Sequence, residues 1–113
     1  MIMLETGQFT VYATFLAKTG QYEALNKLNV ESFEATKAAP GLIHMMFLKP
    51  PKEDKPFVFI AIWESKKHFS TFMKSSEAQA FHNAEAIKVL HETAMEKASA
   101  EFYTLQDVWT APH

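Results

Sequence analysis

The stretch FVFIAIWESKKHF, residues Phe57 to Phe69, decides the fold of this 113-residue chain. It opens with seven apolar residues, which predict a strand that must be covered on both faces. Trp-Glu-Ser then leads into an amphipathic helix. The helices of so short a chain cover one face of a sheet, so we expect a second copy of the chain to cover the other face. The stretch therefore predicts a homodimer.

The length and composition predict a single domain that spans residues 1–113. Apolar residues make up 48% of the chain, which contains ten Phe, and this predicts an apolar interface or an internal cavity. Cysteine is absent, which excludes disulfides and cysteine metal sites. The sequence shows no signal-peptide pattern and no apolar run long enough to cross a bilayer. We therefore expect a cytoplasmic protein that does not bind membranes.

The charged residues argue against nucleic acid as a partner. All eleven basic residues are Lys and the net charge is -2, so no basic surface is expected for a phosphate backbone. The lack of Arg also removes the fork of donors that best binds carboxylate or phosphate. We therefore expect an apolar or neutral ligand. The sequence contains no dense cluster of His, Asp and Glu that would predict a metal site.

Hydrophobic spacing predicts strands and helices in the order βαββαβ, an α+β arrangement. The first helix is expected over Gln21–Lys37, and the second is expected to begin at Ser65 as its N-cap. The second helix restarts at a capping-box pattern, Ser76-Glu77-Ala78-Gln79, and runs to about Ala98. The expected strands are Phe9–Ala17, Leu42–Lys49, Phe57–Trp63 and Glu101–Trp109.

Several motifs in this order make the chain resemble the antibiotic biosynthesis monooxygenase family. They are Gly20 ahead of the first helix, Pro40-Gly41 before the second strand, and Trp63-Glu64-Ser65 with His68 and Phe69. The resemblance implies a ferredoxin-like fold with an antiparallel sheet, and a homodimer that joins sheet to sheet as a dimeric α/β barrel. It also implies one of three activities: cofactor-free oxygenation of hydroquinones or phenols, oxidative heme breakdown, or no known chemistry.

The resemblance also assigns roles to particular positions. In the heme-degrading branch the ligating His matches His82, while a Trp and an Asn of that branch are replaced by Phe72 and Ala13. These two replacements argue against heme turnover. In hydroquinone-oxidising relatives a His often stands where this chain has Glu77.

Histidine is the natural base for a phenol, because its reference pKa of about 6.5 lies near neutral pH. His82 is the first candidate, on the second helix beside Asn83, with an ordinary surface histidine as the alternative. His44 projects from an apolar strand on the same side as Leu42 by alternation, and could line a cavity or an interface. His91 faces the sheet from a stripe of small residues, either as a hydrogen-bonded core residue or as part of the site.

Four further side chains are candidates for substrate binding: Tyr12, Trp63, Phe72 and Asn83. Tyr12 offers a hydroxyl donor from the first strand, and Trp63 offers a flat apolar wall and an indole N–H at a strand end. Asn83 lies beside His82 on the second helix, and Phe72 stands ten residues before His82, where the resemblance places the Trp of the heme-degrading branch. Tyr12 and Trp63 also have an ordinary interpretation as strand or core residues.

These observations lead to a hypothesis of a cofactor-independent monooxygenase. It would use O₂ to oxidise a small aromatic, phenolic or quinol-type molecule in an apolar pocket between helices and sheet, with no cofactor and no metal. One alternative is a heme-binding or heme-degrading protein with His82 as the ligand. The other is a dimeric module that binds a small apolar molecule without altering it.

Overall fold

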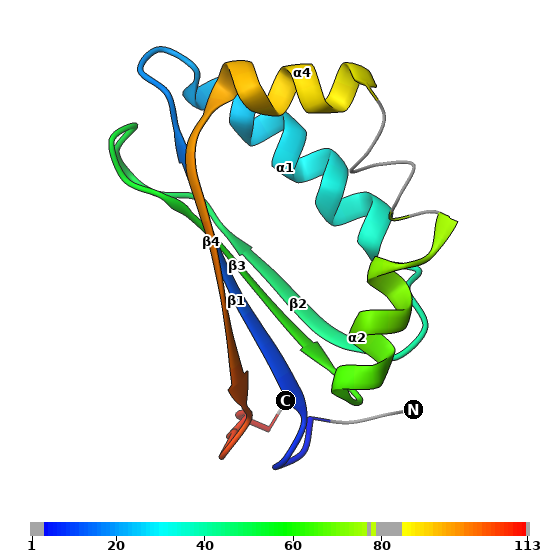
Figure 1. Cartoon of the computed structure of the whole chain (residues 1–113). Coiled ribbons are helices and arrows are strands. Elements are labelled where there is room, and N and C mark those ends of the chain that lie inside the picture. Colours follow the sequence, from blue (N-terminus) through cyan, green and yellow to red (C-terminus); the bar gives the residue numbers. More distant parts are fainter. Residues whose placement is uncertain (1–3, 77, 79–84, 113) are drawn as a thin grey trace.

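The computed structural model describes residues 4–76, 78 and 85–112 as a four-stranded antiparallel sheet with its helices on one face (Figure 1). The strands lie in the order β2-β3-β1-β4. This arrangement confirms the predicted ferredoxin-like α+β fold. The elements, in chain order, are β1 (Phe9–Ala17), α1 (Tyr22–Thr36), β2 (Leu42–Leu48), β3 (Phe57–Trp63), α2 (Lys66–Met73), α4 (Glu85–Ala94) and β4 (Met95–Thr104).

The junction between β3 and α2 forms as its sequence predicts. Ser65 is the N-cap of α2, and its hydroxyl accepts the backbone N–H of His68 at 3.2 Å. Glu64 donates its backbone N–H to the carbonyl of Gly41 at 2.8 Å, which ties this junction to the start of β2. Gly41 has a φ of 86°, a conformation that favours glycine.

The last strand differs from the predicted one, because β4 runs over Met95–Thr104 and not over Glu101–Trp109. The second helix accordingly ends at Ala94, and Ala98 lies within the strand. The residues that follow Ala94 are good helix formers, but they pair with the whole length of β1. This pairing satisfies the backbone groups of β1 along its second edge, which outweighs local helix propensity.

The start of β2 contains a β-bulge that sequence alternation does not reveal. The pairing with β3 shifts between Leu42 and His44. Leu42 therefore packs with Met45 on the helix-facing side, while His44 is exposed on the other side. The prediction that Leu42 and His44 share a side is wrong for this reason.

The core divides into two clusters between the helices and the sheet. One cluster, around Leu25 and Phe57, joins α1 to α4, and the other surrounds Trp63 beneath α2. Leu25 and Phe57 are fully buried. No described helix covers the opposite face of the sheet, which we call the open face and which carries Thr10, Tyr12, Thr14, His44, Met46, Leu48, Val58, Ile60, Ile62, Ser99, Glu101 and Tyr103.

Candidate functional site

A cavity of about 200 Å³ lies between α1, α2 and the helix-facing side of the sheet, and we call it the inner cavity. Its sheet side includes three alanines, because Ala13 of β1 pairs with Ala100 of β4 and Ala61 lies on β3. Side chains of this size leave space under the helices. The other described lining residues are Val11, Phe15, Asn29, Ser32, Thr36, Phe59, Trp63, Phe69, Phe72 and Met73.

Aromatic side chains form the α2 end of the inner cavity. The Trp63 indole lies 5.5 Å from the Phe72 ring and 5.7 Å from the Phe69 ring, measured between centroids. The 69° angle to Phe69 is an edge-to-face contact, a favourable arrangement for aromatic pairs. Trp63 is only 2% exposed, so its position is fixed by packing. The cavity therefore presents a rigid apolar wall to a flat ligand.

Two buried N–H donors of the inner cavity have no hydrogen-bond partner among the described residues. They are Nδ2 of Asn29, on α1, and Nε1 of Trp63, at the end of β3. A buried donor without a partner costs about 1–3 kcal/mol. Thr10 Oγ1 is also buried without a partner, but Thr10 does not line this cavity. These two donors are therefore the buried polar atoms without a partner among the described residues that line the cavity.

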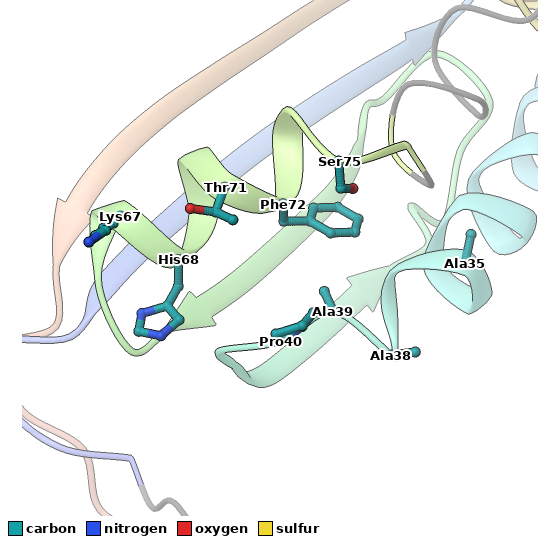
Figure 2. Close-up of a pocket in the computed structure, with 9 residues that line it drawn as sticks. All are labelled: Ala35, Ala38, Ala39, Pro40, Lys67, His68, Thr71, Phe72 and Ser75. Carbon is teal, nitrogen blue, oxygen red and sulfur yellow. The ribbon is translucent and has the colours of Figure 1, made fainter.

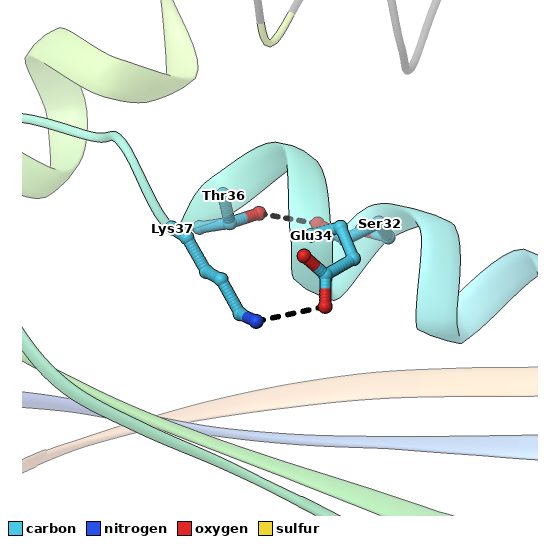
Figure 3. A network of polar contacts seen from close by, with 4 residues as sticks. All are labelled: Ser32, Glu34, Thr36 and Lys37. Atoms are coloured by element: carbon cyan, nitrogen blue, oxygen red, sulfur yellow. Dashed lines mark hydrogen bonds and ion pairs between the residues drawn. The ribbon is translucent and has the colours of Figure 1, made fainter.

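The remaining polar groups on the α1 wall are less available. The Thr36 hydroxyl donates to the Ser32 carbonyl at 2.7 Å, so its hydrogen is already used (Figure 3). One residue further on, Lys37 pairs with Glu34 at 2.8 Å on the exposed side of the helix. None of the described residues that line the inner cavity carries a titratable side chain.

A second, larger hollow of about 620 Å³ lies on the outer side of α2, and we call it the outer groove. Figure 2 shows α2 facing the Ala38–Pro40 turn across this groove. Phe72 lines both the outer groove and the inner cavity, so the two spaces adjoin at this residue. His68 borders the groove, with Nδ1 at 2.7 Å from Ser65 Oγ and Nε2 at 3.3 Å from a Glu64 oxygen. These contacts hold the ring in place.

The structure brings some of the predicted site residues together and separates others. Trp63 and Phe72 meet at the inner cavity, and Ala13 lines it. His44 and Tyr12 lie on the open face, on the opposite side of the sheet from the cavity. His82 and Asn83, predicted as base and binding residue, lie outside the described residues.

His91 lies in the last turn of α4 and is half-buried. Burial lowers the pKa of His91 below its ordinary value, because a charged imidazole loses solvation there. His91 is not among the described residues that line the inner cavity. Its predicted role in substrate binding stays a prediction.

Asn29 was not singled out by the sequence interpretation, although the sequence contains a signal for it. It stands four residues after Leu25 and three before Ser32, on the helix face that turns toward the sheet. A single amide within such an apolar stripe is unusual and points to a buried polar group. The structure adds that Asn29 lines the inner cavity, which the sequence pattern does not reveal.

A model of the antibiotic biosynthesis monooxygenase family matches residues 8–84. The chain belongs to this family. Proteins of this family generally work without a cofactor, in agreement with the sequence prediction. Among the described residues, no group of His, Asp and Glu is arranged to hold a metal ion. None of the described helices has the length and apolar character needed to span a bilayer.

Solved structures of other proteins show the same fold. The chain resembles PA3566 from Pseudomonas aeruginosa at 14% identity, with 93% of this chain and 100% of that chain covered and a TM-score of 0.73. SO0527 from Shewanella oneidensis is 18% identical, with 91% of this chain and 95% of that chain covered and a TM-score of 0.71. SnoaB from Streptomyces nogalater, a cofactor-independent oxygenase, is 16% identical, with 95% of this chain and 99% of that chain covered and a TM-score of 0.64. No curated protein matches the sequence.

Proposed function

We propose that this protein is a cofactor-independent monooxygenase that oxidises a small phenolic or quinol-type molecule in the inner cavity. One observation carries the proposal: a cavity with aromatic walls is lined by Trp63, whose buried indole N–H has no hydrogen-bond partner among the described residues. Membership of a monooxygenase family and the fold shared with SnoaB support it.

The proposed reaction needs little from the protein. A phenol loses its proton, and the electron-rich phenolate passes an electron to O₂. One oxygen atom then enters the ring and the other leaves as water, so that a phenol with a free ring C–H plus O₂ gives a quinone plus H₂O. A dry cavity favours this chemistry, and a fixed N–H donor stabilises the negative charge that develops on oxygen. Trp63 supplies that donor, and we keep His82 as the proposed base.

The size of the inner cavity sets the size of the substrate. An engineered cavity of about 150 Å³ in another protein binds benzene. The inner cavity, at about 200 Å³, therefore fits a single aromatic ring with small substituents. Such a molecule also agrees with the Lys-only basic composition, which lacks the Arg fork for carboxylate or phosphate.

The test is oxygen uptake with a panel of substituted phenols and hydroquinones, compared between the wild type and Trp63→Phe. The substitution keeps the aromatic wall but removes the N–H, and loss of one such donor lowers kcat by about 100-fold or more. Lys27→Gln, an exposed change on α1, serves as the control and should keep full activity. Absence of uptake with every compound, in protein that is folded, would contradict the proposal.

A binding module without chemistry is the second candidate. The observation that favours it is the lack of a titratable side chain among the described residues that line the inner cavity. A ligand that co-purifies with the protein and stays unchanged in air would support this candidate over an oxygenase. The heme alternative depends on His82, and a hemin titration compared with His82→Ala tests it directly.

We also propose that two copies pair through the open face. Met46 and Leu48 are 39% and 48% exposed on this face, beside Val58 and Ile60 of β3. A row of exposed apolar side chains on a sheet is typical of an interface. Sedimentation should give a dimer mass for the wild type and a monomer mass for Met46→Glu. The extent of the domain, residues 1–113, and a cytoplasmic location stay predictions.

A further inference from the structure

Asn29 is a buried polar residue on a largely apolar face of α1. It is 4% exposed, on the face of α1 that buries Tyr22, Leu25 and Leu28. An amide in such surroundings normally finds a hydrogen-bond partner within the protein. Asn29 Nδ2 finds none among the described residues.

Two other polar side chains of α1 have hydrogen-bond partners within the chain. Tyr22 is 7% exposed, and its hydroxyl donates to the carbonyl of Pro50 at 2.7 Å. Thr36, further along, donates to the carbonyl of Ser32. Both hydroxyl groups are satisfied within the chain, whereas the Asn29 amide is left unpaired beside the inner cavity. This contrast separates Asn29 from the structural polar groups of α1.

We propose that Asn29 is a specificity-determining residue whose amide N–H donates to an oxygen atom of the bound ligand. The inference rests on the proposed function in that it uses the same cavity, and it deepens that function by naming what is recognised. Ligands with a phenolic, quinone or ketone oxygen are selected over hydrocarbons of the same shape. Trp63 lies at the end of β3 and Asn29 lies on α1, so the two donors approach the ligand from different elements.

The preference for ligands with an oxygen atom follows because the buried Asn29 donor has no acceptor among the described residues. A ligand oxygen gives the Asn29 N–H the partner that the described part of the chain does not provide. A hydrocarbon fills the same space but leaves the donor without a partner. Sites that hydrogen-bond a substrate oxygen discriminate strongly against analogues that lack it, because the buried donor then stays unsatisfied.

The experiment uses p-cresol and toluene, two single-ring probes that differ in one hydroxyl group. Their affinities for the wild type and for Asn29→Leu are measured by isothermal titration calorimetry. We expect the substitution to weaken p-cresol binding by about tenfold, the factor that corresponds to one hydrogen bond, and to leave toluene binding unchanged. Lys27→Gln is the control: this residue is exposed on α1 and does not line the cavity, so both affinities should stay near wild type.

Urea unfolding without ligand gives an independent readout. If Asn29 is held ready for a ligand, Asn29→Leu unfolds at a urea concentration equal to or above that of the wild type, because an unpaired buried donor is gone. A clearly lower midpoint would show that Asn29 has a structural partner, and it would overturn the inference. An equal loss of p-cresol and toluene affinity would overturn it as well, since only the shape of the cavity would then have changed.

The inference and the proposed function fail in different ways. Protein that binds p-cresol through Asn29 but consumes no oxygen with any phenol would keep the inference and contradict the monooxygenase. Oxygen uptake that is the same in Asn29→Leu and in the wild type, together with unchanged p-cresol affinity, would keep the monooxygenase and contradict the inference. A wild type that binds neither probe would contradict both.

Discussion

Gly41→Ala should destabilise the protein strongly, although glycine and alanine differ by one methyl group. Two features of the structure cause this. Gly41 has a φ of 86°, where a residue with a Cβ costs about 1–2 kcal/mol. A Cβ at this position would also lie 2.6 Å from the Cβ of His68 and closer still to its ring. Overpacking of this kind costs about 1–3 kcal/mol, so the free energy of unfolding should fall by about 2–5 kcal/mol.

The two contributions can be separated with a double-mutant cycle. The strain at φ 86° is independent of His68, while the steric overlap needs its side chain. Gly41→Ala should therefore cost about 1–3 kcal/mol less in a His68→Gly background than in the wild type. His68→Ala should relieve less of the overlap, because alanine keeps the Cβ that lies 2.6 Å away.

Urea unfolding followed by Trp fluorescence measures these differences, with the slope of the transition checked for two-state behaviour. A Gly41→Ala variant within about 0.5 kcal/mol of the wild type, the range of ordinary surface changes, would refute the reasoning. A large effect that is equal in both backgrounds would refute the contact with His68 and leave only the backbone strain. Either result would mean that α2 does not rest directly on this turn.

Three further predictions test other parts of the structure. Phe72→Ala should join the inner cavity to the outer groove, so the variant should bind two-ring phenols that the wild type excludes, and calorimetry with 1-naphthol measures this binding. The substitution should also lower the free energy of unfolding by about 1.5–3 kcal/mol, which urea unfolding measures. Tyr22→Phe should lower the unfolding free energy by about 1–3 kcal/mol, because the Pro50 carbonyl loses its buried partner; an unchanged urea midpoint would contradict this. Burial lowers the pKa of His91, so the folded state favours the neutral imidazole, and stability is lost as the pH falls below about 6.5. Between pH 7 and pH 5 the thermal unfolding temperature should therefore fall less in His91→Gln than in the wild type.

Local sequence rules predicted most of the fold because most elements agree with their own propensity. β3 was predicted over the residues that form it, and α1 and β2 were predicted to within a residue of their ends. The last element was predicted wrongly because Met95 to Ala100 has a local preference for helix, while the free edge of β1 requires a strand. A choice set by a pairing partner far away in the chain cannot be read from a local window.

The site was predicted only in part, for a related reason. Trp63 and Phe72 are recognisable from their residue types and from the family resemblance, and both line the inner cavity. Asn29 and the pair of Ala13 with Ala100 are ordinary in sequence. They become a buried donor and part of a cavity wall only when the register of β1 and β4 and the packing of α1 bring them together.

β3 explains why one strand bears on both chemistry and assembly. Its alternate residues Phe59, Ala61 and Trp63 face the helices and line the inner cavity, while Ile60 and Ile62 face the open side. The continuous apolar run that predicts a doubly covered strand is therefore two separate patterns, each with a period of two residues. The helix-facing pattern has its cover within the chain. On the open face Ile62 is already buried, at 6% exposure, and the proposed dimer supplies the cover for Ile60. Since the two sets of side chains lie on opposite faces, a substitution in one set can alter ligand binding or pairing without direct contact with the other.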